Sequence, residues 1–170
     1  AFLEQSAHGS HIVTGGSGGL ALVTAGWLVG RGASAVVLSS RSGRVGAAQA
    51  DTSAGSVASC ALLAARCDAS EPADVRRLVG VREWRGVWHA AGVLSDGLLR
   101  SQTAASLRRV YAPKAGGAWC LQSACAAAPL DSFVLFSSMA ALCGAGQSHY
   151  SPANCSLDAL SAPRRGPGLA

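Results

Sequence analysis

The chain has 170 residues, which is room for one domain of ordinary size but not for two. Hydrophobic residues make up 49% of it and charged residues 14%, so it is neither a disordered chain nor a coiled coil. The formal charge of +5 comes from scattered or paired arginines without a continuous basic stripe, and aromatic residues are only 5%. These features argue against a nucleic-acid partner. They leave open an anionic cofactor, an acidic partner or simply a basic surface.

Cysteine spacing argues against a metal site. No two of the six cysteines form a C-x-x-C pair, and the four histidines have no ligand spacing with them. Most cysteines lie in alanine-rich runs, where a free thiol behaves as a small hydrophobic side chain. We therefore predict reduced, buried thiols and a cytoplasmic location, with disulfides as the less favoured alternative and organelle targeting not excluded. The six are Cys60, Cys67, Cys120, Cys125, Cys143 and Cys155.

Neither a signal peptide nor a membrane span is predicted. The N-terminus has no basic stretch followed by an apolar one. The most apolar stretch, residues 18–30, ends at Arg31 and is shorter than the ~20 residues that cross a bilayer.

Short apolar runs alternate with helical stretches along the chain. After a polar linker over 1–10, strands are predicted over 11–14, 35–38, 60–66, 86–90 and 132–138. Helices are predicted over 19–30, over 103–127 with a kink or restart at Pro113, and over 150–160, and a further short helix follows a turn at 68–72. Residues 39–55 are predicted to form a loop. Such alternation is typical of a parallel sheet covered on both faces. The predicted fold class is therefore a doubly wound α/β domain.

A glycine-rich segment joins the first predicted strand to the first predicted helix. Its residues are Thr14, Gly15, Gly16, Ser17, Gly18, Gly19 and Leu20. Glycines allow positive φ and let backbone N–H groups approach a pyrophosphate, to which the helix N-terminus adds partial positive charge. A flexible turn is the alternative, but the position in the first strand–helix unit favours a dinucleotide site.

The end of the second strand indicates which dinucleotide would bind. An acidic residue there usually binds the 2′-hydroxyl of the adenosine ribose. This strand ends instead in Ser39, Ser40 and Arg41, and the Arg41 guanidinium can pair with a 2′-phosphate. The pattern favours NADP(H) over NAD(H), with an ordinary surface arginine as the alternative.

Six motifs occur together in an order that resembles one protein family. They are the glycine segment, Ser39–Gly43, HAAGVLSDG at 89–97, APKAGGA at 112–118, FSS at 136–138 and GQSHYSPAN at 146–154. Over residues 11–169 the chain resembles the ketoreductase domain of polyketide and fatty acid synthases, in the short-chain dehydrogenase/reductase superfamily. The resemblance implies a Rossmann-like ketoreductase domain over 11–170. Its activity would be NADPH-dependent reduction of a β-ketoacyl thioester, carried on the phosphopantetheine of an acyl carrier protein, to the β-hydroxyacyl thioester.

The resemblance also implies four catalytic residues. Tyr150 matches the family's proton donor and Ser138 its carbonyl-binding serine, while Asn154 and Lys114 match the asparagine and the lysine of the synthase branch. Hydride delivery turns a ketone oxygen into an alkoxide that must be protonated. A phenol with a pKa of about 10 is a weak acid for this task, and a neighbouring ammonium strengthens it. A serine hydroxyl would polarise the carbonyl, and Asn154 would hold the lysine or a water of a proton relay.

Further positions match the family's cofactor and substrate contacts. Asp68 and Ala69 match the acidic segment near the adenine, and the segment under the nicotinamide ribose matches Ala90, Ala91 and Gly92. Leu94, Ser95 and Asp96 resemble the leucine–aspartate–aspartate motif of B-type ketoreductases, with serine for the first aspartate. The tryptophan that marks A-type members is absent, and Cys143 lies near its place. The resemblance therefore favours B-type stereochemistry, with a D-configured hydroxyl.

The chain departs from the family's pattern at several points. Ala21 stands where the family has its last loop glycine, and the connection from Ser138 to Tyr150 is one residue shorter than usual. The family continues beyond residues 168–169 and has a structural subdomain before its reductase domain. We therefore expect a fragment of a larger multidomain synthase, without the C-terminal strands and with neighbouring synthase domains as partners.

Two other functions remain open at this stage. The first is a structural pseudo-ketoreductase domain that keeps the fold without turnover, although such domains usually lack part of the catalytic set. The second is a general short-chain dehydrogenase that acts on a free alcohol. Asn154 counts against it, because those enzymes have lysine at that position.

Overall fold

The computed structural model describes residues 7–45, 60–143 and 146–162. Five parallel strands form one sheet in the order β3-β2-β1-β4-β5. They are β1 (Ser10–Thr14), β2 (Ala35–Ser40), β3 (Ala61–Arg66), β4 (Gly86–His89) and β5 (Ser132–Leu135). The order reverses between β1 and β4, so the carboxyl ends of these two strands form the topological switch point, where ligands bind in open α/β sheets.

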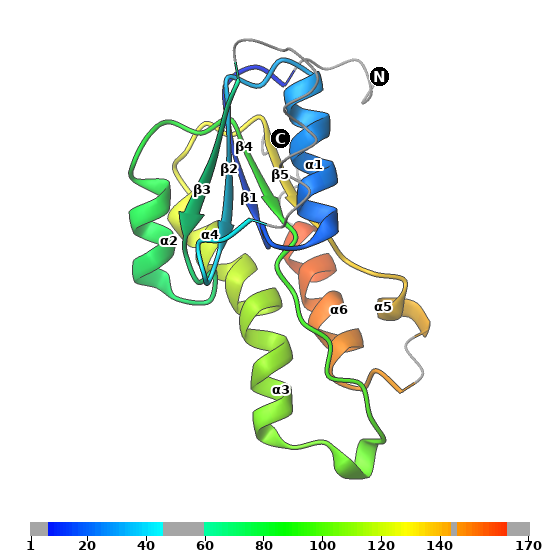
Figure 1. The fold of residues 1–170 in the computed structure, drawn as a ribbon. Helices are drawn as coiled ribbons and strands as arrows, with labels where there is room; N and C mark the ends of the chain where they lie inside the picture. Colours follow the sequence, from blue (N-terminus) through cyan, green and yellow to red (C-terminus); the bar gives the residue numbers. More distant parts are fainter. Residues whose placement is uncertain (1–6, 46–59, 144–145, 163–170) are drawn as a thin grey trace.

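Helices cover both faces of the sheet (Figure 1). They are α1 (Gly19–Gly30), α2 (Pro72–Val79), the 3-10 turn η3 (Leu99–Ser101), α3 (Ala104–Tyr111), the π-helical turn η4 (Ala112–Gly116), α4 (Gly117–Ala124), α5 (Ala140–Cys143) and α6 (Tyr150–Ser161). In Figure 1, α1 lies on one side of the sheet, and α2 and α4 lie on the other. The predicted doubly wound parallel fold is confirmed.

Alternation along the strands divides the core between the two faces. Val13 and Val36 belong to the cluster that packs on α1 through Ala25 and Leu28. Their neighbours Ile12 and Val37, with Val87 of β4, belong to the cluster that packs on α2 and α4 through Val75, Leu78 and Leu121. Since successive side chains of a strand point to opposite faces, apolar residues at consecutive positions are what a sheet covered on both sides requires.

Several predicted boundaries differ from the observed ones. The helical stretch predicted over 103–127, with a kink or restart at Pro113, is α3, η4 and α4, with Pro113 in the π-helical turn and the last helix ending at Ala124. A proline has no N–H to give to a regular helix, and the irregular turn accommodates it. Strand β2 continues to Ser40, so the loop predicted from residue 39 begins later, and its residues 46–59 lie outside the described part of the chain.

The ends of the first and last strands also differ from the prediction. Of the segment predicted as a linker, residues 1–6 are outside the described ranges, and Ser10 already pairs with Ala35 as the first residue of β1. Strand β5 ends at Leu135, three residues earlier than predicted, and the short helix α5 was not predicted. Residues 136–138 thereby leave the sheet and connect β5 to α5.

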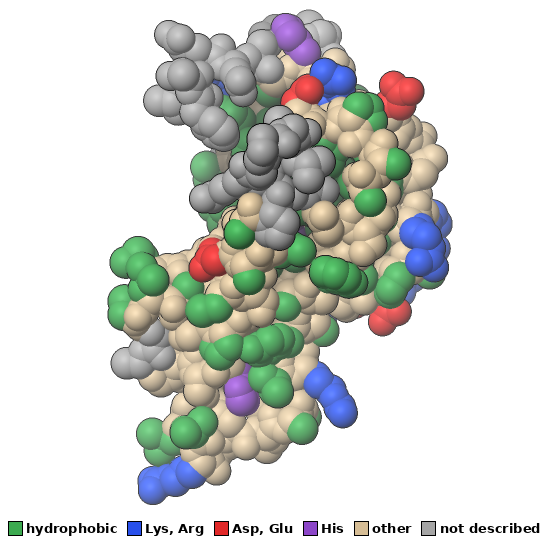
Figure 2. Space-filling model, turned by 180° about the vertical axis from the view of Figure 1, so that it is seen from behind, with side chains coloured by type: hydrophobic (Ala, Val, Ile, Leu, Met, Phe, Trp, Pro, Cys, Tyr) green, Lys and Arg blue, Asp and Glu red, His purple; other side chains and the backbone are tan. Residues whose placement is uncertain are grey.

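The lower part of the molecule has an apolar surface. Figure 2 shows hydrophobic side chains gathered there, on the side that carries α3, α5 and α6. The exposed residues of this surface are Leu94, Leu98, Leu99, Leu107, Met139 and Leu142. An exposed apolar surface of this kind commonly marks a site of interaction.

Candidate active site

Backbone contacts hold the glycine segment at the switch point. Gly15 has a φ of +75°, and a Cβ added there would lie 2.8 Å from the carbonyl oxygen of Ala90. A Cβ on Gly16 would lie 3.0 Å from the carbonyl carbon of Leu38, and the Gly16 N–H donates to the Ser39 carbonyl over 2.9 Å. Only glycine fits such close approaches. The first-turn N–H groups of α1 have no partner within the helix and are available to an anion.

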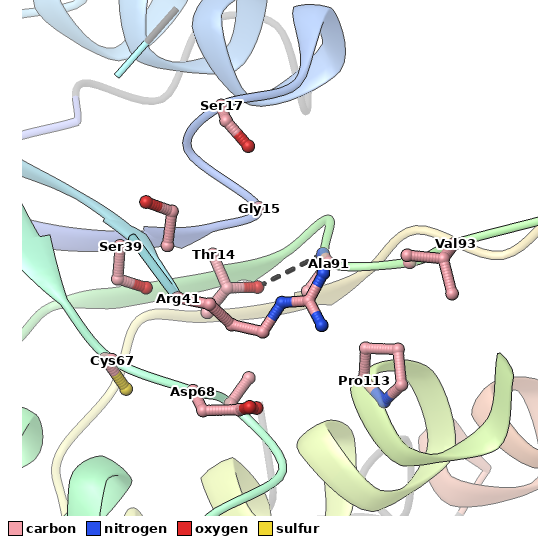
Figure 3. A pocket seen from close by; sticks show the side chains of 13 residues that line it. Thr14, Gly15, Ser17, Ser39, Arg41, Cys67, Asp68, Ala91, Val93 and Pro113 are labelled. Atoms are coloured by element: carbon pink, nitrogen blue, oxygen red, sulfur yellow. Dashed lines mark hydrogen bonds between the residues drawn. The ribbon is translucent and has the colours of Figure 1, made fainter. Parts of the chain in front are cut away.

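A pocket of about 140 Å³ lies beside this segment, across the carboxyl ends of the strands (Figure 3). Nine of its lining residues were predicted as cofactor contacts: Thr14, Gly15, Ser17, Ser40, Arg41, Asp68, Ala69, Ala91 and Gly92. Four lining residues were missed: Ser39, Cys67, Val93 and Pro113. Each of the four is adjacent in sequence to a predicted site residue. Extending the predictions by one position at every strand end would have found most of them.

Five of the predicted cofactor residues do not line this pocket: Gly16, Gly18, Gly19, Leu20 and Ala90. Gly16 is buried against β2, and the Ala90 carbonyl lies under Gly15, so these two shape the wall from behind. Gly19 and Leu20 are the first two residues of α1, and the Leu20 side chain is exposed. They lie at the N-terminus of α1, outside the pocket wall.

Asp68 and Arg41 occupy different environments in the pocket. Asp68 Oδ1 accepts hydrogen bonds from the Ser70 N–H over 3.0 Å and the Ser70 hydroxyl over 2.7 Å, which fixes the carboxylate. Arg41 is exposed just after β2 and extends into the pocket region (Figure 3). Burial raises the pKa of the neighbouring Cys67 thiol to about 11, so this sulfur is uncharged and unreactive at neutral pH.

Lys114 is buried beside the pocket, at the centre of the π-helical turn. Its side chain is almost fully covered, and Nζ donates a hydrogen bond to the Phe136 carbonyl over 2.8 Å. The same Nζ lies 5.2 Å from the centroid of the Tyr150 ring. Burial lowers the pKa of Lys114 to about 8, and the Asp158 carboxylate opposes the shift weakly.

The other three predicted catalytic residues lie on α6 and on the segment between β5 and α5. Tyr150 opens α6, and Asn154 one turn later donates from Nδ2 to the Tyr150 carbonyl over 2.8 Å. The Asn154 side chain is buried, and its Oδ1 has no hydrogen-bond partner among the described residues. Ser138 follows Phe136 by two residues, and its Oγ accepts from the Ala140 N–H over 3.2 Å. The structure thus brings Lys114 and Tyr150 into contact despite the shortened connection, with Ser138 placed in the segment after β5.

The segment predicted to influence stereochemistry lies close to the segment before Tyr150. Asp96 Oδ2 accepts from Gln147 Nε2 over 3.4 Å, and the Gly97 N–H donates to the Gly146 carbonyl over 3.3 Å. Leu94 is exposed on the apolar lower surface. These two bonds tie the 94–97 loop to the strand–helix connection that ends at Tyr150.

The cysteine prediction is only partly right. All six cysteines are within the described ranges and carry free thiols. Cys67 and Cys125 are buried and Cys60 and Cys120 half-buried, but Cys143 and Cys155 are exposed. The prediction of burial is wrong for the last pair because α5 and the outer face of α6, which carry them, stand at the surface of the described structure.

Two absences apply to the described part of the chain. No group of three or more histidine, cysteine, aspartate or glutamate side chains is arranged to hold a metal ion there. Within the same ranges, every helix is too short or too polar to cross a membrane.

Comparison with known proteins identifies the family. The family model for the KR domain matches residues 9–170. The chain is 39% identical to a phenolphthiocerol/phthiocerol polyketide synthase subunit of Mycobacterium tuberculosis (strain ATCC 25618 / H37Rv) and 40% identical to phthioceranic/hydroxyphthioceranic acid synthase of Mycobacterium bovis (strain BCG / Pasteur 1173P2). The matches cover 96% and 95% of this chain but only 8% of each relative.

Solved structures give the same result. An A1-type ketoreductase is similar with a TM-score of 0.87 and 35% identity, over 97% of this chain and 36% of that one. A ketoreductase from the first module of phoslactomycin biosynthesis in Streptomyces sp. HK803 has a TM-score of 0.87 and 32% identity, over 96% of this chain and 40% of that one. Such domains are oxidoreductases that bind a nicotinamide cofactor. The chain belongs to the ketoreductase (KR) domain family of polyketide synthases, within the short-chain dehydrogenase/reductase superfamily.

Proposed function

We propose that the chain reduces a β-ketoacyl thioester, carried by an acyl carrier protein, to the β-hydroxyacyl thioester with NADPH. The observation that carries the proposal is the buried Lys114 ammonium, which lies 5.2 Å from the centre of the Tyr150 ring and donates to the Phe136 carbonyl. This is the only lysine of the chain, whose other cations are arginines. A charge that is costly to bury, held against a tyrosine ring and beside the pocket at the carboxyl ends of the strands, favours a catalytic role.

The residues of the pocket fit a phosphorylated dinucleotide. The backbone at Gly15 and Gly16 packs so closely against the segment after β4 and against β2 that a Cβ does not fit, and the adjacent N-terminus of α1 offers N–H groups to a pyrophosphate. Ser40 and Arg41 line the pocket where an acidic residue would favour NAD(H). The exposed Arg41 side chain can reach a 2′-phosphate in this pocket, which supports NADPH as the cofactor. Bound NADPH would supply the hydride for the carbonyl carbon of the substrate.

The side chains around Lys114 would manage the charge on the substrate oxygen. The Ser138 hydroxyl would donate to the carbonyl oxygen and stabilise the negative charge that develops on it. The Tyr150 hydroxyl would then give its proton to that oxygen. The Lys114 ammonium, next to the ring, would favour the tyrosinate that is left and would bind the nicotinamide ribose.

Asn154 would complete the route for the proton. Its Nδ2 is held by the Tyr150 carbonyl, so its Oδ1 is the group that remains available, and the Lys114 ammonium has further hydrogens beyond the one given to Phe136. A water between these two groups would carry a proton toward Tyr150. A buried amide oxygen with this role needs no other protein partner.

Two finer parts of the proposal concern the substrate. The exposed Leu94, which follows the pocket residue Val93, and the exposed Leu98 and Leu99 offer apolar surface to an acyl chain. Leu94 and Asp96, together with the absence of the A-type tryptophan, favour the B-type product with a D-configured hydroxyl. Chiral chromatography of the product from a β-ketoacyl thioester mimic tests this, and an L-configured product would contradict it.

The reaction is tested by NADPH oxidation with a β-ketoacyl-N-acetylcysteamine thioester. Tyr150→Phe removes only the proposed proton donor and should lower kcat by about 10²–10⁴-fold, while NADPH still binds. Tyr111→Phe is the matched control, since it removes the hydroxyl of the chain's other tyrosine, on α3, and should keep wild-type turnover. Turnover that survives Tyr150→Phe would contradict the mechanism. Binding of NADPH by the wild type without any turnover would favour a structural pseudo-ketoreductase.

A further inference from the structure

His89 is a buried polar side chain that the proposed mechanism does not use. It is the last residue of β4 and is only 1% exposed. Both ring nitrogens have partners: Nδ1 lies 2.8 Å from the Thr14 hydroxyl, and Nε2 lies 2.9 Å from the carbonyl oxygen of Lys114. One imidazole therefore links the end of β1, the end of β4 and the π-helical turn.

The chemistry of the partners fixes the direction of these hydrogen bonds. A carbonyl oxygen only accepts, so Nε2 must carry a proton and donate it to Lys114. In the neutral ring Nδ1 then accepts, and the Thr14 hydroxyl donates to it. The Thr14 oxygen in turn accepts from the Ala91 N–H over 3.3 Å. Burial lowers the pKa of His89 to about 4, so the ring is neutral at physiological pH and keeps this pattern.

Lys114 is consequently held at both ends. Its backbone carbonyl is bonded to β4 through His89, and its ammonium is bonded to the Phe136 carbonyl just after β5. A π-helical turn alone is a poor support, because its geometry is rarely stable outside a packed context. The His89 ring also packs directly against Gly117, where an added Cβ would lie 2.8 Å from its Cε1 atom.

We infer that His89 is a positioning residue: its Nε2–H holds the Lys114 carbonyl and so sets where the Lys114 ammonium meets the Tyr150 ring. The kinetic part of this inference rests on the proposed function. The same linkage joins the Thr14 end of the glycine segment to the catalytic lysine. Positioning matters for rate because a shift of about 1 Å in a reacting group costs about a hundredfold.

Two substitutions separate the two bonds of the ring. In His89→Gln the amide N–H reaches the position of Nε2 and can still donate to Lys114. In His89→Asn the shorter amide keeps a partner for Thr14 but does not reach Lys114. We expect His89→Asn to lower kcat about tenfold to a hundredfold with KM for the thioester changed less than about threefold, and His89→Gln to restore kcat to within about threefold of wild type. Equal loss in the two variants would overturn the inference, since it would assign His89 to core packing alone.

A second readout does not depend on activity. Because Lys114 is the only lysine of the 170 residues, lysine labelled with ¹³C at its carbonyl gives one signal from the chain. In the wild type this carbon should correlate through the hydrogen bond with the Nε2–H of ¹⁵N-labelled histidine, and the signal should shift in His89→Asn but not in His89→Gln. An Nδ1–H tautomer in the wild type, or an unshifted carbonyl in a folded His89→Asn chain, would overturn the inference. If the wild type lacks turnover, the proposed function fails, whereas the carbonyl signal still decides the role of His89.

Discussion

At the carboxyl ends of β1 and β4 the glycine segment packs closely against neighbouring backbone, whereas the described residues between Ser137 and Asn154 contain several buried polar side-chain atoms without a hydrogen-bond partner. The first region, which we call the binding half, includes Gly15 and Gly16. A Cβ added to these residues would lie 2.8 Å from the Ala90 carbonyl oxygen and 3.0 Å from the Leu38 carbonyl carbon, respectively. The second, the reacting half, contains most of the buried polar side-chain atoms that have no partner among the described residues. These atoms are Ser137 Oγ, Ser148 Oγ, His149 Nε2, Ser151 Oγ and Asn154 Oδ1, against Ser39 Oγ alone in the binding half.

The contrast indicates two ways of building one site. A cofactor that binds in the same way each time is served by a rigid surface, which costs little to organise at the moment of binding. A reacting group that gains charge needs donors and acceptors that the protein has not already used on itself. Unpaired buried polar atoms cost stability, so their concentration around Tyr150 is itself a sign of function.

Lys114→Met tests the reacting half and should have the largest effect. Loss of the ammonium removes the group that favours the tyrosinate, so kcat should fall about a thousandfold, equivalent to ~4 kcal/mol. NADPH affinity should fall by less, because Lys114→Met removes only the proposed contact with the nicotinamide ribose while the binding half keeps its backbone contacts. Stopped-flow turnover and NADPH fluorescence titration measure the two quantities. A comparable loss of both would erase the division between the halves.

Gly15→Ala tests the binding half. Its new Cβ would meet the Ala90 carbonyl at 2.8 Å while the residue is held at a φ of +75°, so we expect a loss of about 3 kcal/mol in stability or a shifted loop with weakened NADPH binding. Gly26→Ala is the matched control, since a Cβ at Gly26, inside α1, has nothing within 4 Å. That control should gain up to about 1 kcal/mol from helix propensity. Thermal denaturation with and without NADPH distinguishes the two variants, and equal behaviour would refute the close packing.

Arg41→Ala tests whether the binding half selects NADPH over NADH. A guanidinium that pairs with a 2′-phosphate contributes about 1.5–3 kcal/mol, so the KM for NADPH should rise about tenfold to a hundredfold. NADH has no such phosphate, and its KM should not change. Arg44→Ala is the control, because Arg44 is also exposed after β2 but does not line the pocket. Equal effects on the two cofactors would contradict the assignment of NADPH.

The sequence was sufficient for those parts of the site that depend on local backbone rules. Alternating apolar runs identified the parallel sheet, and the glycine segment after β1 identified the switch point, because strand periodicity and positive φ are properties of a few adjacent residues. Of the nine predicted residues that line the pocket, Thr14, Gly15, Ser17, Ser40 and Arg41 follow from such rules, whereas Asp68, Ala69, Ala91 and Gly92 were assigned from the resemblance to the family.

What the sequence could not supply depends on contacts between distant segments. The π-helical turn at Lys114 appeared only as a helix with a kink or restart at Pro113, because the turn is held by bonds to β4 and to the segment after β5 rather than by its own residues. The role of His89 was invisible for the same reason: its two partners are 75 and 25 residues away. The short helix α5 and the exposure of Cys143 likewise follow from how the chain leaves β5.

The smallest expected effect is the pH dependence of stability, and it isolates the charge at the centre of the reacting half. Burial lowers the pKa of Lys114 to about 8, below the ordinary value of 10.5, so between these two values the unfolded chain binds more protons than the folded one. Stability due to this group must therefore rise with pH across that interval, by at most about 1.4 kcal/mol for each pH unit. Below pH 8 the ammonium is charged in both states and the folded state bears the full cost of burying it.

Other groups change stability in the opposite direction over the same pH range, and a matched variant removes them. Burial raises the pKa of the Cys67 thiol to about 11. The contribution of this thiol to the free energy of unfolding therefore falls as the pH rises above the pKa that the thiol has in the unfolded chain. Lys114→Met keeps every thiol and lacks only the ammonium. The difference in unfolding free energy between wild type and Lys114→Met, from urea titrations at pH 7.5 and 9.5, should therefore shift in favour of the wild type at the higher pH. A difference that is independent of pH would mean that Lys114 is solvated in the folded protein, and the cost of the buried charge would then no longer distinguish the reacting half from the binding half.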